Sequence, residues 1–143
     1  EILYITGKSY YERFKENKFP KNVFIVPYVD NLSGLMKDFD LIVCRSGASS
    51  VAEITSIRIP AIFIPSPYVA NNHQFYNAES VVKEGAGFMI EEKDLTTVKL
   101  SDTIHELLSD EKLVFEIEKN AKSMAILDSR ERIAQIIVSL AEK

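Results

Sequence analysis

Five consecutive small residues have the composition of an anion-binding loop. They are Ser46, Gly47, Ala48, Ser49 and Ser50. Their side chains are short, so a ligand can come close to the backbone N–H groups. A helical pattern begins near Ser50, and the first turn of a helix has unpaired N–H groups and a partial positive charge. The segment therefore predicts a seat for a phosphate group, with an ordinary helix cap as the alternative.

Strands alternating with helices must position this loop. Apolar runs at residues 2–5, 23–26, 41–44, 61–64 and, more weakly, 87–90 predict strands, and the segments between them have helical periodicity. This alternation predicts an α/β fold, a parallel sheet with helices on both faces. Right-handed crossovers place the carboxyl ends of the strands at one edge, where ligands of such sheets bind.

After residue 94 the pattern is helical only. It predicts three amphipathic helices, and the last is expected to turn an inner apolar face toward the core; that face consists of Ile133, Ile136, Ile137 and Leu140. There is no internal repeat and no linker, so residues 1–143 are interpreted as one domain.

Composition excludes several classes of function. The net charge of −4 argues against a nucleic-acid partner, since no segment is strongly basic. A single cysteine, Cys44, excludes an internal disulfide and is interpreted as a core thiol at a strand end. No apolar run is long enough to cross a bilayer, so membrane contact is expected to be peripheral or to come from a part outside this sequence. The sequence contains neither a Walker A lysine motif nor G-x-G-x-x-G.

Three ordered motifs are more distinctive. The first is Arg45 to Ser49 with Glu53, the second is the Pro-rich segment 60–67, and the third is residues 71–74 followed by Tyr76-Asn77-Ala78. In this order and at these separations they resemble the MurG family, the bacterial UDP-N-acetylglucosamine transferases of peptidoglycan synthesis. The likeness runs from about residue 2 to the last helix.

The resemblance implies a GT-B arrangement of two Rossmann-like domains, of which this chain is similar to the C-terminal, donor-binding half. The implied reaction moves GlcNAc from UDP to lipid I, with inversion, and gives lipid II. The implied location is peripheral, on the cytoplasmic face of the bacterial inner membrane. Neither a cofactor nor a metal is expected. No catalytic residue is expected in this chain, because the resemblance places the general base and the lipid I contacts in the other half.

Relative to the family, the chain is expected to lack the first strand, the Gly-rich loop and the first helix of the domain. Two hypotheses follow: residues 2–5 pair directly with residues 41–44, or another chain fills the gap. Two other functions stay open as well. One is the donor-binding domain of a different GT-B transferase, such as a diacylglycerol glucosyltransferase; the other is a non-catalytic UDP-sugar-binding subunit.

The resemblance also gives roles to individual residues near the loop. Glu53 would accept hydrogen bonds from the ribose hydroxyls, although with Ser50 it also fits a capping box that would occupy the same carboxylate. Residues 46–50 would hold the diphosphate. Arg45 would neutralise the donor, or would instead pair with a nearby carboxylate such as Asp40.

Three polar residues at the start of the fourth helix complete the expected site. By resemblance Gln74 and Asn77 contact the sugar hydroxyls, with His73 beside them. Neutral amides suit an uncharged sugar because each both donates and accepts hydrogen bonds. Asn72 is the expected N-cap of this helix. Val29 matches the family position whose backbone groups bind the edge of uracil.

Overall fold

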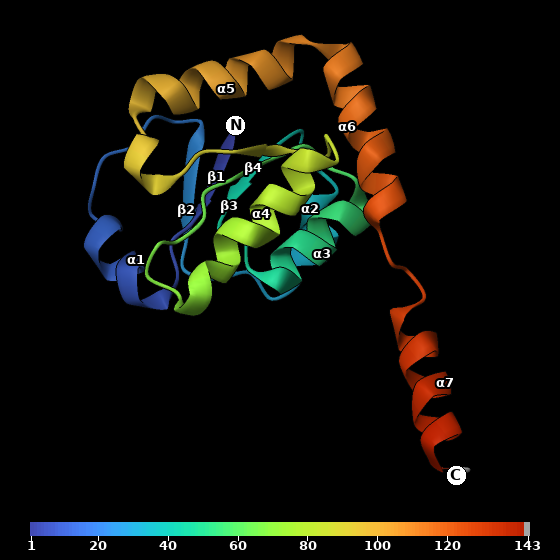
Figure 1. Ribbon diagram of the computed structural model, residues 1–143. Coiled ribbons are helices and arrows are strands. Elements are labelled where there is room, and N and C mark those ends of the chain that lie inside the picture. The colour runs from blue at the N-terminus through green and yellow to red at the C-terminus, as the bar shows by residue number, and fades with distance from the viewer. Residues whose placement is uncertain (142–143) are drawn as a thin grey trace. The chain divides into compact units, whose positions relative to one another are not determined.

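The computed structural model describes residues 1–141, which form two compact units. The first unit comprises Glu1–Leu35, and the second begins at Met36. Strands and helices alternate up to β5, and only helices follow it (Figure 1). The prediction of an α/β fold with parallel strands is confirmed. That all of this forms one domain stays a prediction.

The first unit contains a two-stranded parallel sheet. β1 (Ile2–Ile5) pairs with β2 (Val23–Val26), with Ile2 opposite Val23, and both strands match the predicted apolar runs. The helix α1 (Lys8–Phe14) connects them, and α2 (Leu32–Met36) follows β2. None of residues 1–35 is fully buried.

The second unit is built on a three-stranded parallel sheet in the order β3–β4–β5. The strands are β3 (Ile42–Cys44), β4 (Ala61–Phe63) and β5 (Phe88–Met89). They are connected by α3 (Ala48–Ile57) and by the 3-10 helix η1 (Ala70–Asn72) followed by α4 (His73–Lys83). Each crossover therefore leads to the neighbouring strand, and the three carboxyl ends share one edge.

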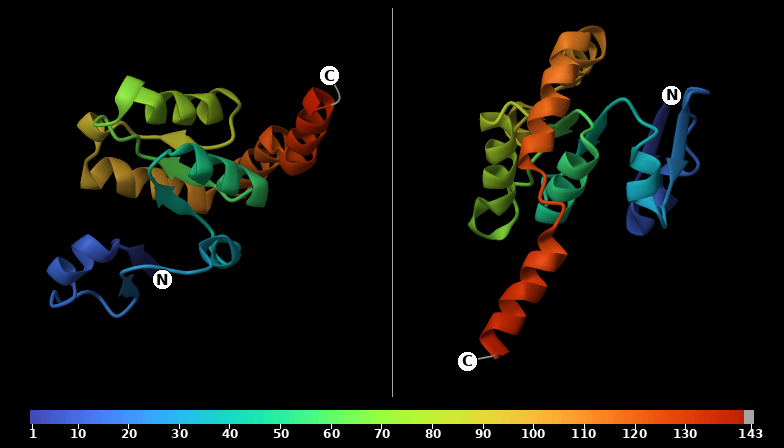
Figure 2. Two further views of the ribbon diagram at one scale, coloured as in Figure 1. Left: turned by 90° about the horizontal axis from the view of Figure 1, so that it is seen from below. Right: turned by 90° about the vertical axis from the view of Figure 1, so that its right-hand side faces the viewer.

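Helices cover both faces of this sheet, as predicted. Ile62 points to a core shared with Leu107 and Ile117, whereas its neighbour Phe63 points to the opposite face, close to Gly87 and Val81 of α4. This alternation follows from the two-residue repeat of a strand. In the left-hand view of Figure 2 the strands lie between α4 and α5. All three β4 residues are fully buried, which makes β4 the centre of the core.

Each unit has its own sheet: within residues 1–141, β1 pairs with β2 in the first unit, and β3, β4 and β5 pair in the second. Consecutive strands joined by one crossover pair locally in both units. The hypothesis that residues 2–5 pair with residues 41–44 stays a prediction. That another chain fills a gap stays a prediction.

Three helices follow the sheet, in agreement with the periodicity after residue 94. The 3-10 helix η2 (Glu92–Asp94) precedes α5 (Thr97–Ser109), α6 (Glu111–Met124) and α7 (Ser129–Ala141). Thr96 and Asp110 cap α5 and α6 through their side-chain oxygens. In the part of the chain that the structure describes, no helix combines the length and apolar character needed to cross a bilayer.

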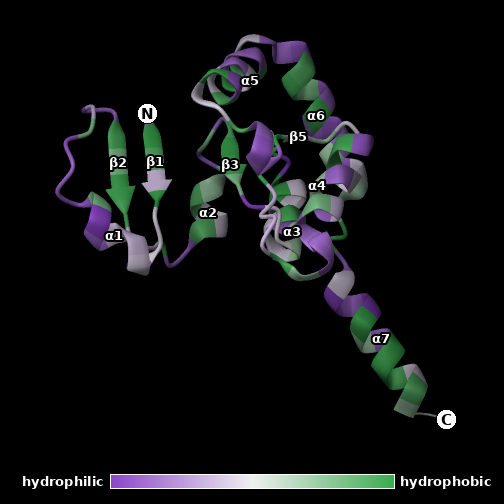
Figure 3. Ribbon diagram, turned by 60° about the vertical axis from the view of Figure 1, so that its left-hand side comes forward, coloured by the Kyte–Doolittle hydropathy of each residue, from purple (hydrophilic) through white to green (hydrophobic). Residues whose placement is uncertain are grey.

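The apolar face of α7 is not an inner face. Ile133, Ile136, Ile137 and Leu140 are between 57% and 64% exposed, so the expectation that they face the core is wrong. Figure 3 shows that much of α7 is hydrophobic. A helical period identifies which face is apolar, but it does not identify what covers that face.

Candidate functional site

The small-residue loop leads from β3 into α3, but the helix begins earlier than predicted. Gly47 is the N-cap and Ala48 is the first helical residue, so α3 starts two residues before Ser50. The first helical hydrogen bond runs from the Val51 N–H to the Gly47 carbonyl, and no side chain caps the helix. Within residues 1–141 no hydrogen bond engages the N–H groups of Ala48, Ser49 and Ser50. These donors are the ones an anion would use.

The early start of α3 excludes the capping box. Ser50 lies inside the helix rather than at its N-cap, so it cannot form the reciprocal pair with Glu53. Glu53 is exposed, and among the described residues its carboxylate makes no hydrogen bond or ion pair. Both carboxylate oxygens are thus available to a ligand.

Ser46 connects the N-terminal ends of two helices. It is fully buried, and its hydroxyl donates to the Gln74 carbonyl at 2.7 Å. Its own carbonyl accepts from Nδ2 of Asn77 at 3.0 Å. Gln74 and Asn77 belong to the first two turns of α4, so the two bonds hold the start of α3 against the start of α4. The burial of Ser46 is explained by this pair of bonds, because a buried polar group needs partners.

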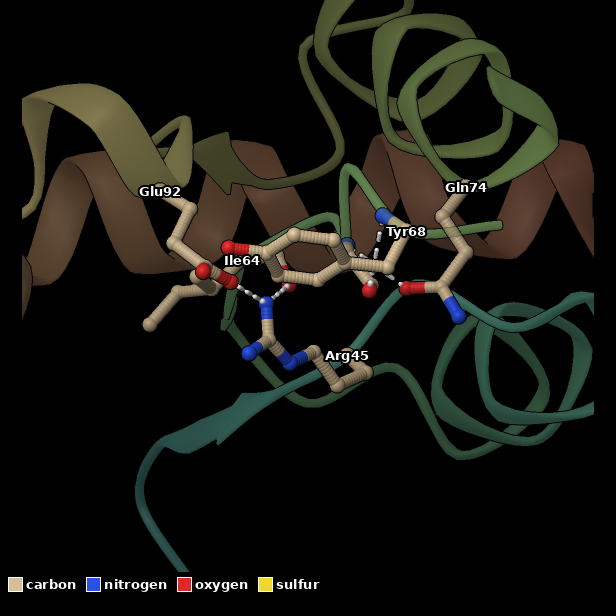
Figure 4. Close-up of polar contacts among 6 residues, drawn as sticks. Arg45, Ile64, Tyr68, Gln74 and Glu92 are labelled. Atoms are coloured by element: carbon tan, nitrogen blue, oxygen red, sulfur yellow. Dashed lines mark hydrogen bonds and ion pairs between the residues drawn. The ribbon is translucent and has the colours of Figure 1, made fainter. Parts of the chain in front are cut away.

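These hydrogen bonds determine which atoms of the two amide side chains remain available to a ligand. The Oε1 atom of Gln74 accepts from the Ser66 N–H at 2.9 Å, and Figure 4 shows its amide nitrogen pointing away from that loop. Asn77 has its Nδ2 committed to Ser46, which leaves Oδ1. Gln74 therefore offers a donor and Asn77 an acceptor, a complementary pair for a neutral hydroxyl group.

The turn before α4 has an unusual backbone. Asn71 and Asn72 both have positive φ, 54° and 51°, in the left-handed region that Asn tolerates better than most residues. Asn72 occupies the N-cap position as predicted, but its side chain makes no capping hydrogen bond. His73 is exposed, and its Nδ1 lies 2.9 Å from the Ala70 carbonyl oxygen. A carbonyl only accepts, so Nδ1 donates and Nε2 is left for other contacts.

Arg45 pairs with a carboxylate that the sequence did not indicate. Its Nη1 donates to Oε2 of Glu92 at 2.6 Å and to the Ile64 carbonyl at 3.2 Å (Figure 4). Asp40, the suggested partner, is exposed and forms no ion pair among the described residues. Glu92 is 47 positions away in the sequence. The available signal was that Glu92 lies three residues after the end of β5, at the sheet edge where Arg45 follows β3.

The remaining predicted residue, Val29, belongs to the first unit, where it is half-buried between β2 and α2. Its role toward uracil stays a prediction. Cys44 is mostly buried at the end of β3, and desolvation raises the pKa of its thiol to about 11. Such a thiol is protonated at neutral pH and is a poor nucleophile. No group of three or more His, Cys, Asp or Glu within residues 1–141 is placed to hold a metal ion.

Chemically, the carboxyl edge of the second sheet combines three kinds of group. Free N–H groups at the start of α3 suit an anion, the Glu53 carboxylate suits a pair of hydroxyls, and the amides of Gln74 and Asn77 suit a neutral polar ligand. The roles of the eleven predicted residues toward a ligand stay predictions, because the structure contains the protein alone. The geometry nevertheless brings residues 45–53 and 73–77 to one edge.

Relatives of known name match along the whole chain. A protein of Bacillus cereus is 40% identical over 147 aligned residues, which cover 100% of this chain and 40% of that protein. It is named UDP-N-acetylglucosamine--N-acetylmuramyl-(pentapeptide) pyrophosphoryl-undecaprenol N-acetylglucosamine transferase 1. A transferase of the same name without the number, from Caldanaerobacter subterraneus subsp. tengcongensis, is also 40% identical, over 98% of this chain. The chain spans about 40% of the length of these relatives.

Solved structures share the fold at lower identity. The crystal structure of Acinetobacter baumannii MurG superposes with a TM-score of 0.81 at 23% identity, covering 96% of this chain and 41% of that one. The glycosyltransferase VinC in complex with dTDP gives a TM-score of 0.76 at 19% identity, covering 100% of this chain and 35% of VinC. The model of the glycosyltransferase family 28 C-terminal domain matches residues 1–135, nearly the entire chain. The chain therefore belongs to the glycosyltransferase family 28 C-terminal domain family.

Proposed function

We propose that this chain binds the nucleotide-sugar donor in an inverting transferase that moves GlcNAc from UDP to lipid I and forms lipid II. The observation that carries the proposal is the 40% identity, along the whole chain, to a transferase named for this donor and acceptor. The edge geometry supports it, because the groups that a diphosphate, a ribose and a sugar each require lie on neighbouring helices.

In this proposal each part of the donor has its own partner. The diphosphate lies against the N–H groups of Gly47 to Ser50, where the partial positive charge of α3 stabilises its negative charge. The ribose hydroxyls donate to Glu53, and the sugar hydroxyls contact Gln74 and Asn77. The side chain of Ser46 positions the two helices rather than touching the phosphate, because its hydroxyl is bonded to Gln74.

The chemical step needs a base for the acceptor hydroxyl, and we propose no residue of this chain for it. The base and the lipid I contacts are proposed to come from the acceptor-binding half of the enzyme. That enzyme is proposed to act at the cytoplasmic face of the bacterial inner membrane as a peripheral protein. This chain's contribution is to bind and orient the donor, which lowers the entropic cost of reaching the transition state.

The decisive experiment measures donor affinity in the full-length protein. UDP-GlcNAc, UDP-glucose and UDP are titrated by calorimetry into the wild type and into Glu53→Ala. We expect the wild type to prefer UDP-GlcNAc over UDP-glucose, and we expect Glu53→Ala to bind all three at least about tenfold more weakly. The reason is that the variant removes a charged acceptor from two ribose hydrogen bonds, each worth about 1.5–3 kcal/mol.

Glu106→Ala provides the matched control, because Glu106 is also an exposed helical glutamate and lies in α5. It should leave all three affinities unchanged. Unchanged affinity in Glu53→Ala would remove the ribose contact from the proposal. Absence of UDP binding by the wild type would reject donor binding altogether.

A further inference from the structure

The ion pair between Arg45 and Glu92 joins the carboxyl ends of all three strands of the second sheet. Arg45 follows β3, Ile64 follows β4, and Glu92 opens η2 shortly after β5. A single guanidinium nitrogen, Nη1, contacts both Glu92 and the Ile64 carbonyl. The Arg45 side chain is 51% exposed and the Glu92 side chain 29% exposed, so the pair lies at the rim of the sheet edge.

The Ile64 carbonyl is the start of the loop that leads to α4. This loop, residues 64–72, is held near the same end by a second side chain, since the Ser66 N–H donates to Gln74. Arg45 and Gln74 therefore fix two backbone positions only two residues apart, one from each side (Figure 4). Beyond Ser66 the loop runs through Tyr68, which is 85% exposed, to Asn71 and Asn72, which both have positive φ.

We propose that Arg45 and Glu92 form a clamp that positions loop 64–72 and thereby sets how well the site recognises the sugar of its donor. Arg45 acts on the loop through Ile64, and Glu92 acts through Arg45 by fixing the guanidinium. Both are positioning residues in this assignment. The inference rests on the proposed function, because it concerns the sugar part of the same donor.

The charge of the pair supports this role over direct binding of the diphosphate. The guanidinium of Arg45 is already neutralised by Glu92 at 2.6 Å. An anion that approached Arg45 would also approach the Glu92 carboxylate, and the attraction and repulsion would largely cancel. A neutral sugar has no such penalty. The N–H groups of Ala48 to Ser50, which have no protein partner among the described residues, are better placed to bind the charged part of the donor.

The test compares Arg45→Gln, Glu92→Ala and Glu92→Gln in the full-length protein, with Glu91→Gln as the matched control. Glu91 precedes Glu92 and pairs with Lys93 instead of Arg45, so its variant removes the same charge from the neighbouring position. For each protein the Kd of UDP-GlcNAc and the Kd of UDP are measured, and their ratio reports recognition of the sugar.

Arg45→Gln and Glu92→Ala should raise this ratio about threefold to tenfold while leaving the Kd of UDP unchanged. Glu92→Gln keeps an acceptor for Nη1 and should raise the Kd ratio by only about twofold. Glu91→Gln should leave the Kd ratio unchanged. The double variant Arg45→Gln/Glu92→Ala should match Arg45→Gln alone, because Glu92 acts through Arg45. Equal weakening of UDP and UDP-GlcNAc by Arg45→Gln would instead make Arg45 a diphosphate contact and overturn the clamp.

A second measurement needs no ligand and separates the clamp from the proposed function. In the free protein, hydrogen exchange of the Ser66 amide should be about threefold to tenfold faster in Glu92→Ala than in the wild type or Glu91→Gln. Unchanged exchange at Ser66 would reject the clamp even if the wild type binds UDP-GlcNAc. Failure of the wild type to bind UDP would reject the proposed function, while faster exchange would still support the loop contact.

Discussion

At the scale of single residues, one hydrogen bond determines what an amide side chain can offer a ligand. Gln74 and Asn77 each have a donor and an acceptor, and sequence reasoning could predict only that both face the site. The structure gives Gln74 a free nitrogen and Asn77 a free oxygen, because their other atoms hold Ser66 and Ser46. The two amides are therefore not equivalent, and substitutions at them should have different consequences.

Gln74→Glu should separate binding from folding. The carboxylate keeps an acceptor for the Ser66 N–H, so the free energy of unfolding should change by less than about 1 kcal/mol. The nitrogen donor is lost and a negative charge is added, so UDP-GlcNAc should bind at least about fivefold more weakly. Calorimetric titration and chemical denaturation measure the two quantities. A variant that binds as tightly as the wild type would show that the amide nitrogen does not contact the sugar.

Cys44 gives a prediction about pH. Burial raises the pKa of its thiol to about 11, above the value in the unfolded chain. Between the two values the folded protein keeps the proton and the unfolded chain releases it, so the free energy of unfolding should fall as pH rises through this range. Below the unfolded pKa this contribution is fully present.

Thiol labelling measures the same shift directly. Iodoacetamide should modify native Cys44 much more slowly than the denatured chain at pH 8, and the native rate should still rise with pH above 9. Cys44→Ala provides the control for pH effects on stability that come from other groups. Equal labelling rates of native and denatured protein at pH 8 would contradict the raised pKa.

At the scale of elements, the sequence predicted those features that depend on local pattern. Uninterrupted apolar runs identified β1 and β2 to the residue, and amphipathic periods identified α5 and α6. The start of α3 was predicted two residues late, because small residues that precede a helix do not distinguish an N-cap from a first turn. The partner of Arg45 was missed, since finding it requires the knowledge that the carboxyl ends of β3 and β5 share one edge although two crossovers separate them in the sequence.

Two glycines of the second unit should lose different amounts of stability when a methyl group is added. A Cβ at Gly87 would lie 3.1 Å from the Ala61 carbonyl and 3.3 Å from both Phe63 and Val81. Gly87→Ala should therefore lower the free energy of unfolding by about 1–3 kcal/mol, because the packed core beneath α4 cannot easily move. Denaturant midpoints at constant m value measure this cost.

Gly47→Ala is the matched comparison, because a Cβ there meets nothing nearer than Ser50 Oγ at 3.9 Å. Its cost in stability should stay below about 1 kcal/mol. The new methyl group would occupy space that the donor diphosphate is proposed to use, so UDP affinity should fall although the fold is intact. A destabilisation as large as that of Gly87→Ala, or unchanged UDP affinity, would contradict this distinction.

At the scale of the whole molecule, the two units differ in how much they bury. The second unit contains fully buried residues such as Ile62, Phe63 and Leu107, whereas none of residues 1–35 is fully buried. Apolar burial is the main contribution to stability. Backbone amides in a region that buries little apolar surface exchange their hydrogens through local opening. The sequence did not predict this difference, because β1 and β4 are both uninterrupted apolar runs and only tertiary packing distinguishes them.

Native-state hydrogen exchange of the 143-residue chain should therefore resolve two levels of protection. Amides of β1 and β2, for example those of Tyr4 and Ile25, should exchange through a local opening at low denaturant. The Ile62 and Phe63 amides of β4 should exchange only with global unfolding.

Leu107→Ala removes a buried side chain from the second unit and should lower the protection of β4 by about 2–5 kcal/mol. Because Leu107 lies in α5, the same substitution should leave the exchange of Tyr4 and Ile25 unchanged at low denaturant. Equal protection of β1 and β4, or loss of both in Leu107→Ala, would show that the units unfold as one cooperative body.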